Sequence, residues 1–248
     1  MCGRYELHAH PAAIALAFGL SRPPHLAARY NIAPMTDVPV VRVGATRERE
    51  LAHMRWGLVP RWARDASIGA KLINARGETL AVRRAFEMPY RRHRCLIPAN
   101  GFYEWLAVAA SSQVPAHKRP MHVGMKDGEL FGMGGLCERW LSPDGEVLDT
   151  CTIVTTDSND LVRPIHDRMP LILAPRDYER WLDPARADVR DLIAPYPSSE
   201  MSAYPVSMRV NSARHDDASL IEHDARGDIE VLHDAHEPAP EPEQESLF

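Results

Sequence analysis

Cysteine is scarce in this sequence of 248 residues, which contains four: Cys2, Cys95, Cys137 and Cys151. They form no CxxC pair and no close cluster, so neither a zinc knuckle nor a disulfide-stapled secreted scaffold is indicated. Long apolar runs are also missing, because none approaches the roughly 20 residues of a membrane-spanning helix. A phosphate-binding glycine loop and internal repeats are absent as well. We therefore expect a cytoplasmic protein without a metal, a cofactor or a membrane partner.

Positive charge is missing from the end of the chain. Residues 227–248 hold seven acidic residues and no Lys or Arg, so the net charge of −5 leaves residues 1–226 at +2. That part has local arginine clusters, such as the one from Arg83 to Arg94, which are either phosphate-binding surfaces or solvated charged faces. Residues 227–248 are too rich in Pro and Glu to bury apolar surface, so we predict a domain over 1–226 and a disordered tail over 227–248.

Strand patterns outnumber helical ones. Apolar, β-type runs lie at 38–43, 53–59, 94–99, 101–106, 130–135, 151–156 and 168–173. Helical patterns are expected at 12–20, 77–86, 175–182 and 187–194, with Pro184 between the last two. Strands and helices do not alternate regularly, which favours α+β over a doubly wound sheet. We expect one mixed, largely antiparallel β domain with short flanking helices.

The apolar run at 12–20 has a second interpretation, the hydrophobic region of a secretory signal. Glu6 precedes the run, and SRPP follows it without a small-residue cleavage pattern. A short helix that begins near Pro11 fits better.

The most distinctive residue is Cys2, which becomes the N-terminal residue when Met1 is removed. An N-terminal cysteine carries an amine and a thiol on adjacent carbons. The amine condenses with an aldehyde to an imine, and the thiol then closes a five-membered thiazolidine ring in an intramolecular step. The alternative use is acyl transfer, in which the amine activates its own thiol toward an amide.

Three other polar residues stand in apolar surroundings. Glu104 lies between Tyr103 and Trp105, where burial would raise its pKa and suit it to acid–base chemistry, although an outward-facing strand position is the simpler interpretation. His166 and Asn74 are weak signals alone, because most histidines are surface or core residues and an asparagine often serves as a turn or cap residue.

Six motifs in order change this assessment: MCGRY, RYNIAP, RWGLVPRWA, NARGET, RCLIPANGFYEW and TTDSNDLVRPIHDRMPLIL. Together they resemble the SRAP family, the SOS response-associated peptidases that act on abasic sites in DNA. The resemblance runs from Met1 to about residue 217. It implies an SRAP-like fold and a nucleoid-associated protein that acts as a monomer on single-stranded DNA with abasic sites during the DNA damage response.

The resemblance also implies catalytic roles. Cys2 would attack the ring-opened aldehyde of an abasic site and form a stable thiazolidine crosslink that shields the lesion. Asn74 would hold the opened sugar and Cys2 by hydrogen bonds, and Glu104 would move protons during imine formation. His166 would protonate the sugar oxygen and help to reverse the link. Strand cleavage as a lyase and self-removal of Met1 as a peptidase are further implied activities, although a methionine aminopeptidase could equally remove Met1.

The DNA-binding residues come from the same match. Arg4, Arg76 and Arg84 would grip backbone phosphates, and Trp62 would support a base by stacking. We place Arg168 in the same DNA-binding group. Pro34 is either an apolar wedge at the strand junction or a strand-starting proline.

The sequence departs from the family pattern at GGLCER (134–139), where Cys137 replaces a common tryptophan and brings a second thiol toward the site or changes the packing. Glutamine amidotransferases also begin Met-Cys-Gly, but Arg4 and Tyr5 interrupt their apolar strand pattern. A noncatalytic single-strand binding module would leave Cys2 and Glu104 without a role.

The last five residues, QESLF, resemble the pentapeptide by which bacterial replication and repair proteins bind the sliding clamp. Gln244, Leu247 and Phe248 match that motif and Glu245 departs from it. The alternative is an acidic tail that ends in two apolar residues by chance.

Overall fold

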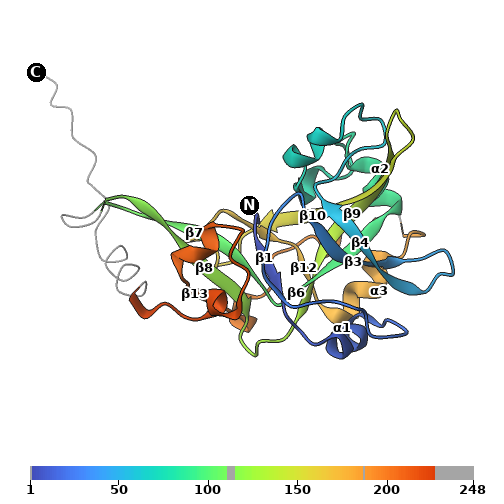
Figure 1. The fold of residues 1–248 in the computed structure, drawn as a ribbon. Helices are drawn as coiled ribbons and strands as arrows, with labels where there is room; N and C mark the ends of the chain where they lie inside the picture. Colours follow the sequence, from blue (N-terminus) through green and yellow to red (C-terminus); the bar gives the residue numbers. More distant parts are fainter. Residues whose placement is uncertain (1, 111–114, 187, 227–248) are drawn as a thin grey trace, which may run out of the picture.

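Two β-sheets form most of the protein in a computed structural model, which describes residues 2–110, 115–186 and 188–226 (Figure 1). The strands are β1 (Tyr5–Leu7), β2 (Arg29–Ile32), β3 (Asp37–Val43), β4 (Arg49–Trp56), β5 (Asn74–Arg76), β6 (Arg94–Ala99), β7 (Gly101–Val108), β8 (His117–Met125), β9 (Phe131–Leu141), β10 (Val147–Asp157), β11 (Arg168–Pro170), β12 (Ile172–Leu173) and β13 (Met201–Pro205). The helices are α1 (Pro11–Phe18), α2 (Glu87–Arg92) and α3 (Tyr178–Leu182), and the 3-10 turns are η1 (Ala66–Lys71), η2 (Gly77–Thr79), η3 (Pro175–Asp177), η4 (Arg190–Leu192), η5 (Ser198–Glu200), η6 (Met208–Asn211) and η7 (Ala218–Ile221).

The first sheet has five strands in the order β13-β8-β7-β1-β2. All of its pairings are antiparallel. β1 lies between β7 and β2, so the start of the chain is held from both sides.

The second sheet curls into a barrel. Its strand order is β11-β10-β4-β3-β6-β9-β12, and an additional pairing of β10 with β9 closes a ring of strands. β10 runs parallel to β4 and β5, while the other pairings are antiparallel. Every residue of β6 is buried, as the apolar run from Cys95 to Ala99 indicates, and Arg94 at its start is buried as well. The expected mixed, largely antiparallel α+β fold with short helices is confirmed.

The apolar run at 12–20 forms helix α1, which begins at Pro11 as expected. The His10 side chain accepts a hydrogen bond from the Ala12 amide (3.2 Å), and Gly19 ends the helix in the left-handed conformation with φ of 65°. Ile14 and Phe18 are fully buried. This segment is therefore part of the hydrophobic core. No described helix has both the length and the apolar character needed to cross a membrane.

The helix expected at 77–86 is wrong. A 3-10 turn covers Gly77–Thr79, turns follow, and helix α2 begins only at Glu87. The apolar residues of this stretch do not share one helical face, because Leu80 and Phe86 are buried whereas Val82 is 77% exposed.

Two other expectations are corrected in part. The pattern at 187–194 yields only the 3-10 turn η4, because the Asp188 carboxylate accepts from the Arg190 amide (3.1 Å) and from its side chain. The run at 168–173 forms two short strands, β11 on β10 and β12 on β9. The predicted tail over 227–248 lies outside the described residues.

Candidate active site

Cys2 lies three residues before the start of β1 at Tyr5, with its side chain fully buried. Its thiol is 3.9 Å from the Arg4 carbonyl oxygen. The pairing of β1 with β7 extends back to Arg4, whose carbonyl accepts a hydrogen bond from the Tyr103 amide (2.9 Å). In this register Glu104 stands one residue further along, opposite Gly3. The ladder thus brings the second residue of the chain beside Glu104.

Asn74 reaches Cys2 from the other sheet. It is the first residue of β5, which the parallel pairing with β10 positions next to Ile153. Its side-chain amide donates to the Cys2 carbonyl oxygen at 2.8 Å. Its Oδ1 atom is buried and has no hydrogen-bond partner among the described residues. Since a buried acceptor without a partner costs stability, this atom is suited to receive a donor from a ligand.

Glu104 and Cys2 act on each other electrostatically. Glu104 is 3% exposed. Burial raises the pKa of its carboxyl, and the charge of His166 opposes that rise. Burial also raises the pKa of the Cys2 thiol, and the negative charge of Glu104 raises it further. The thiol is therefore protonated at neutral pH, beside the buried carboxyl group of Glu104.

His166 completes the group from the loop before β11. Its backbone amide donates to the Val162 carbonyl (2.9 Å), which fixes the turn. Its Nδ1 atom lies 3.0 Å from the Arg168 amide nitrogen and 2.8 Å from an Asp167 carboxylate oxygen. A neutral Nδ1 accepts from the amide, whereas a protonated Nδ1 pairs with the carboxylate. The ring is thus supported in both protonation states.

Arg4 is half-buried beside this group. Its Nη1 atom donates to Asn31 Oδ1 (2.7 Å) and to the Val210 carbonyl oxygen (2.9 Å). Burial lowers the pKa of the guanidinium. Both acceptors are neutral, so the positive charge of Arg4 is not cancelled by them.

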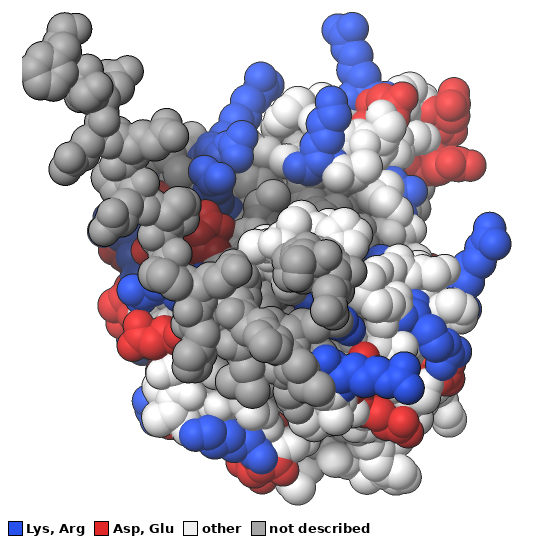
Figure 2. Space-filling view, turned by 90° about the vertical axis from the view of Figure 1, so that its left-hand side faces the viewer, with Lys and Arg blue, Asp and Glu red and all other residues white. Residues whose placement is uncertain are grey.

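Three of the predicted DNA contacts lie at the surface. Arg76 ends β5, and both it and Arg84 are exposed without an ion pair to any described residue. The Arg84 guanidinium stacks over the ring of Trp62, 4.7 Å from its centroid, and Trp62 is 44% exposed. Trp62 and Arg84 thus form one cation–π unit that combines an aromatic face with a charge. Figure 2 shows further Lys and Arg side chains at several places on one face of the molecule, with Asp and Glu between them.

Arg168 is engaged differently. Its guanidinium donates to Glu78 (2.7 Å), to Asp157 (2.7 Å) and to the Thr155 carbonyl oxygen (2.8 Å). Two carboxylates therefore already surround its charge, and a phosphate would share this arginine with them.

Pro34 lies in the turn between β2 and β3, not in a strand. The next residue, Met35, has a positive φ of 66° and is 37% exposed, and its amide donates to the Trp56 carbonyl (2.8 Å). The strand-starting interpretation of Pro34 is wrong, and its role as a wedge stays a prediction.

Comparison with known proteins identifies the family. The family model for SOS response associated peptidase (SRAP) matches residues 1–213. The chain belongs to the SRAP family. It is 40% identical over 228 residues to the abasic site processing protein YoqW of Bacillus subtilis, covering 90% of this chain and 99% of that protein. It is 31% identical over 211 residues to the abasic site processing protein HMCES of Xenopus tropicalis, covering 75% of this chain and 63% of that protein.

Solved structures agree with this assignment. A crystal structure of a protein from Bacteroides thetaiotaomicron superimposes with a TM-score of 0.76 at 27% identity, covering 90% of this chain and 100% of that chain. A protein from Bordetella bronchiseptica gives a TM-score of 0.71 at 29% identity, covering 84% of this chain and 100% of that chain. The two-sheet arrangement is therefore the SRAP fold.

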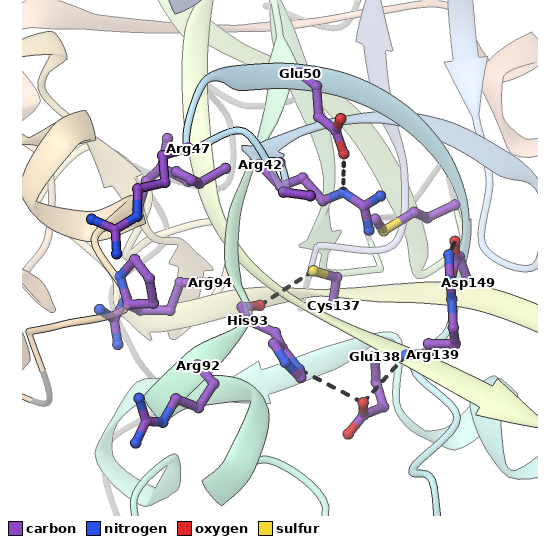
Figure 3. Close-up of a pocket in the computed structure, with 16 residues that line it drawn as sticks. Arg42, Arg47, Glu50, Arg92, His93, Arg94, Cys137, Glu138, Arg139 and Asp149 are labelled. Carbon is purple, nitrogen blue, oxygen red and sulfur yellow. Dashed lines mark hydrogen bonds and ion pairs between the residues drawn. The ribbon is translucent and has the colours of Figure 1, made fainter.

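Cys137, the second thiol considered in the sequence analysis, lines a different place from the candidate active site. It forms part of a cavity of about 300 Å³ whose wall also includes Arg42, Arg92 and His93 (Figure 3). Its thiol donates to the His93 carbonyl (3.3 Å), and it stands opposite Cys151 in the β9–β10 ladder. None of the four candidate catalytic residues lines this cavity.

Sequence reasoning missed several residues that support the site. Asn31 contacts Arg4, Glu78 contacts Arg168, and Trp105 follows Glu104 with its indole held by Asn211 (2.7 Å). Asn31 and Glu78 lie inside the motifs RYNIAP and NARGET, but nothing in those motifs specifies their partners. Among the described residues, no three His, Cys, Asp or Glu side chains come together as a metal-binding group.

Proposed function

We propose that this SRAP protein processes abasic sites in single-stranded DNA by forming a covalent thiazolidine crosslink through Cys2 after removal of Met1. The observation that carries the proposal is that two functional side chains act on Cys2 directly and a third acts on it through Glu104. Asn74 donates to its carbonyl at 2.8 Å, the charge of Glu104 acts on its thiol, and His166 acts on Glu104. The relatives named abasic site processing proteins support the same substrate.

In the first step the Cys2 amine attacks the aldehyde carbon of the ring-opened sugar. A C–N bond forms, water leaves, and an imine results. Because burial and the charge of Glu104 raise the pKa of the thiol, the sulfur is protonated and the amine reacts first. Glu104 accepts and returns protons as the hydroxyl departs, a task for which a carboxyl of raised pKa is suited.

In the second step the Cys2 sulfur adds to the imine carbon. The S–C bond forms, the thiol proton is transferred, with Glu104 as carrier, to the nitrogen, and the five-membered ring closes. Asn74 orients the reacting group, since its amide fixes the Cys2 carbonyl and its Oδ1 atom is left to accept from the sugar hydroxyl or the ring nitrogen. His166 protonates the sugar oxygen and assists reversal.

DNA binding in this proposal uses the phosphate backbone and one base face. The phosphates are bound by Arg4, Arg76 and Arg84. Trp62 stacks on a base, while the Arg84 guanidinium covers the Trp62 ring. These contacts do not read sequence, which suits an enzyme whose target is a lesion. We further propose that the protein acts as a monomer at the nucleoid in the cytoplasm, which light scattering and imaging of a tagged protein would test.

The test is incubation of the mature protein with a single-stranded oligonucleotide that carries one abasic site, followed by a denaturing gel. We expect a covalent band. The matched control is the same oligonucleotide with a tetrahydrofuran residue, which lacks the aldehyde and should give no band. A protein with an uncleavable extension before Cys2 should also give none, because a thiol alone forms only a labile hemithioacetal. Normal crosslinking by that extended protein would refute the mechanism.

The implied lyase activity follows from the free Cys2 amine, and the implied peptidase activity, removal of Met1, is the step that exposes this amine. Cys2→Ser keeps the amine and loses the thiol, so it should lose the stable crosslink and retain imine formation with strand cleavage. Whether the protein removes its own Met1 is tested by producing it in a cell-free system without methionine aminopeptidase and measuring the mass of the N-terminal peptide.

A second function is binding of the bacterial sliding clamp by the last five residues, which lie outside the described residues. Only the match of Gln244, Leu247 and Phe248 to the clamp-binding pentapeptide favours it. A short peptide that orders on binding should be a micromolar ligand. Titration of a fluorescent tail peptide with clamp tests this. Equal binding by a peptide with Leu247→Ala and Phe248→Ala would refute it.

A further inference from the structure

A segment near the C-terminal end of the described residues organises one side of the active site. Residues 207–223, the C-terminal strap, lie against the five-stranded sheet (Figure 1). Val210 and Leu220 of the strap are fully buried in a small apolar cluster with Tyr103 of β7. The strap is therefore anchored on the strand that carries Glu104.

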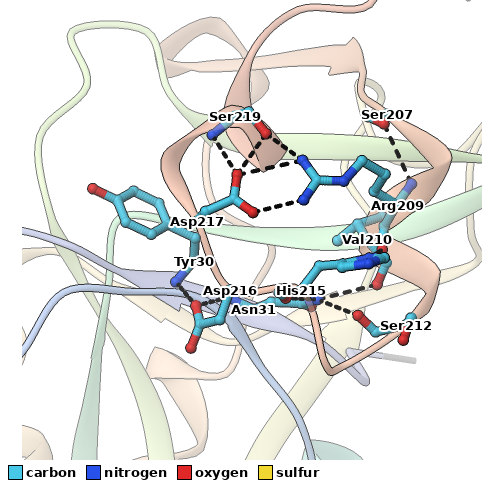
Figure 4. A network of polar contacts seen from close by, with 10 residues as sticks. All are labelled: Tyr30, Asn31, Ser207, Arg209, Val210, Ser212, His215, Asp216, Asp217 and Ser219. Carbon is cyan, nitrogen blue, oxygen red and sulfur yellow. Dashed lines mark hydrogen bonds and ion pairs between the residues drawn. The ribbon is translucent and has the colours of Figure 1, made fainter.

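The strap is also stiffened internally (Figure 4). Arg209 donates to the Asp217 carboxylate (2.8 Å) and to the Ser219 hydroxyl (2.6 Å) across its two 3-10 turns. Asp217 caps the second turn by accepting from the Ser219 amide (3.2 Å). These contacts hold the strap in one conformation over β2.

Asn31 of β2 links the strap to Arg4. Its side chain is buried, and its Nδ2 atom donates to the carbonyl oxygens of Ser212 (3.0 Å) and His215 (2.7 Å), with a longer contact to Val210 (3.3 Å). Its Oδ1 atom accepts from Arg4 Nη1 at 2.7 Å. Because both ends of this amide are engaged, its orientation is fixed, and so is the acceptor that faces Arg4.

Two further contacts join the strap to the site. The Asp216 carboxylate accepts from the backbone amides of Tyr30 and Asn31, the latter at 3.0 Å, and so holds β2 against the strap. The Asn211 side chain accepts from the Trp105 indole (2.7 Å), next to Glu104.

Arg4 is left in a state that favours phosphate binding. Both hydrogens of its Nη1 atom have neutral acceptors, Asn31 Oδ1 and the Val210 carbonyl, while its Nη2 atom makes no hydrogen bond to the described residues. Its charge is therefore held in place without being cancelled, in contrast to Arg168 with its two carboxylates. Partial burial strengthens the attraction of such a charge for an anion.

We propose that Asn31 and the C-terminal strap position Arg4 for a backbone phosphate of the bound DNA strand, with Asn31 as a positioning residue. This inference rests on the proposed function, because it assigns the phosphate contact of that same site. It predicts that substitution of Asn31 weakens DNA binding only when Arg4 is present.

The experiment measures binding of undamaged single-stranded DNA by fluorescence anisotropy over a range of salt concentrations. Arg4→Ala should lower the magnitude of the slope of log K against log salt by about 0.7, the value for one phosphate contact to a single strand. Asn31→Ala should lower affinity and slope in the same direction. In the double variant the Asn31 substitution should add little to the Arg4 substitution. Arg180→Ala removes an equal charge from α3 and should leave binding unchanged.

If Asn31→Ala shows no cooperative unfolding and is therefore not folded, Asp216→Asn is the milder substitution to test. It should weaken binding by a few fold, and this loss should vanish in the Arg4→Ala background. Two results would overturn the positioning role. One is that folded Asn31→Ala or Asp216→Asn binds DNA as tightly as the wild type. The other is that these substitutions lower the DNA affinity of Arg4→Ala as much as that of the wild type. Crosslinking of abasic DNA is scored in the same samples. Its absence in the wild-type protein would refute the proposed function instead.

Discussion

Glu104→Gln removes proton transfer by this side chain while keeping its shape. Glu104 is 3% exposed and lies beside Cys2, and glutamine has nearly the same volume, so the variant should fold and bind DNA. Two effects oppose each other. Loss of a positioned acid–base group costs roughly 10²–10⁴-fold in rate. Loss of its negative charge lowers the pKa of the Cys2 thiol, which favours ring closure. Since imine formation precedes ring closure, we expect crosslinking to slow by roughly 100-fold.

The pH dependence of the crosslinking rate is a second test of the acid–base role of Glu104. Burial raises the pKa of Glu104 above its ordinary value, so the wild-type rate should rise with pH as this carboxyl loses its proton. Glu104→Gln should lack that rise. Its Cys2 thiol should also react faster with iodoacetamide at neutral pH, because the thiol pKa falls.

The assay is single-turnover crosslinking with excess protein, quenched at intervals and resolved on a denaturing gel at several pH values. Glu179→Gln, an exposed position on α3, is the matched control and should behave like the wild type. A Glu104→Gln rate within about threefold of the wild type, with an unchanged pH profile, would refute the acid–base role of Glu104.

Three further outcomes are expected. His166→Ala should slow release of the crosslink, measured by transfer of protein from labelled to unlabelled DNA, and should affect its formation less. Glu78→Gln should tighten binding of single-stranded DNA by two- to threefold in anisotropy, because it removes one of the carboxylates that share Arg168 with a phosphate. Glu6→Gln should lower the free energy of unfolding by roughly 2 kcal/mol. Burial alone would raise the pKa of Glu6, but its hydrogen bonds with His122 and then with His8 hold that pKa low, and the hydrogen bond with Glu6 raises the pKa of His8. The loss should therefore be largest between the ordinary pKa values of Glu6 and His8, 4.5 and 6.5. It should shrink as pH falls through the folded pKa of Glu6 or rises through that of His8, which pH-dependent denaturation would measure.

The continuous apolar strands were predictable from sequence, and the short ones were not. β6 matches the expected 94–99 because all six of its residues are apolar or buried by the barrel. β1 and β5 have three residues each, too few for periodicity to show, yet they carry the site. The helix expected at 77–86 failed because residues from distant parts of the chain pack there, such as Ile193 against Gly77.

The candidate site follows the same division. Cys2 stood out by its chemistry, but Asn74, Glu104 and His166 were assigned through the family resemblance, and only the fold brings them to Cys2. The buried Glu6 was not anticipated, because its partner His122 lies 116 residues away. Asn31 and Asp216 were missed for the same reason, since the hydrogen bonds that define their role span some 185 residues.

The most direct test of the central claim is the chemical state of Cys2 in the crosslinked product. Trypsin releases the N-terminal peptide Cys2–Arg4 with its sugar remnant. A thiazolidine uses both the amine and the thiol, so this peptide should carry the sugar with loss of one water and should resist iodoacetamide and borohydride. A crosslinked peptide whose Cys2 thiol is still alkylated, or whose link is reduced by borohydride as an imine, would contradict the account.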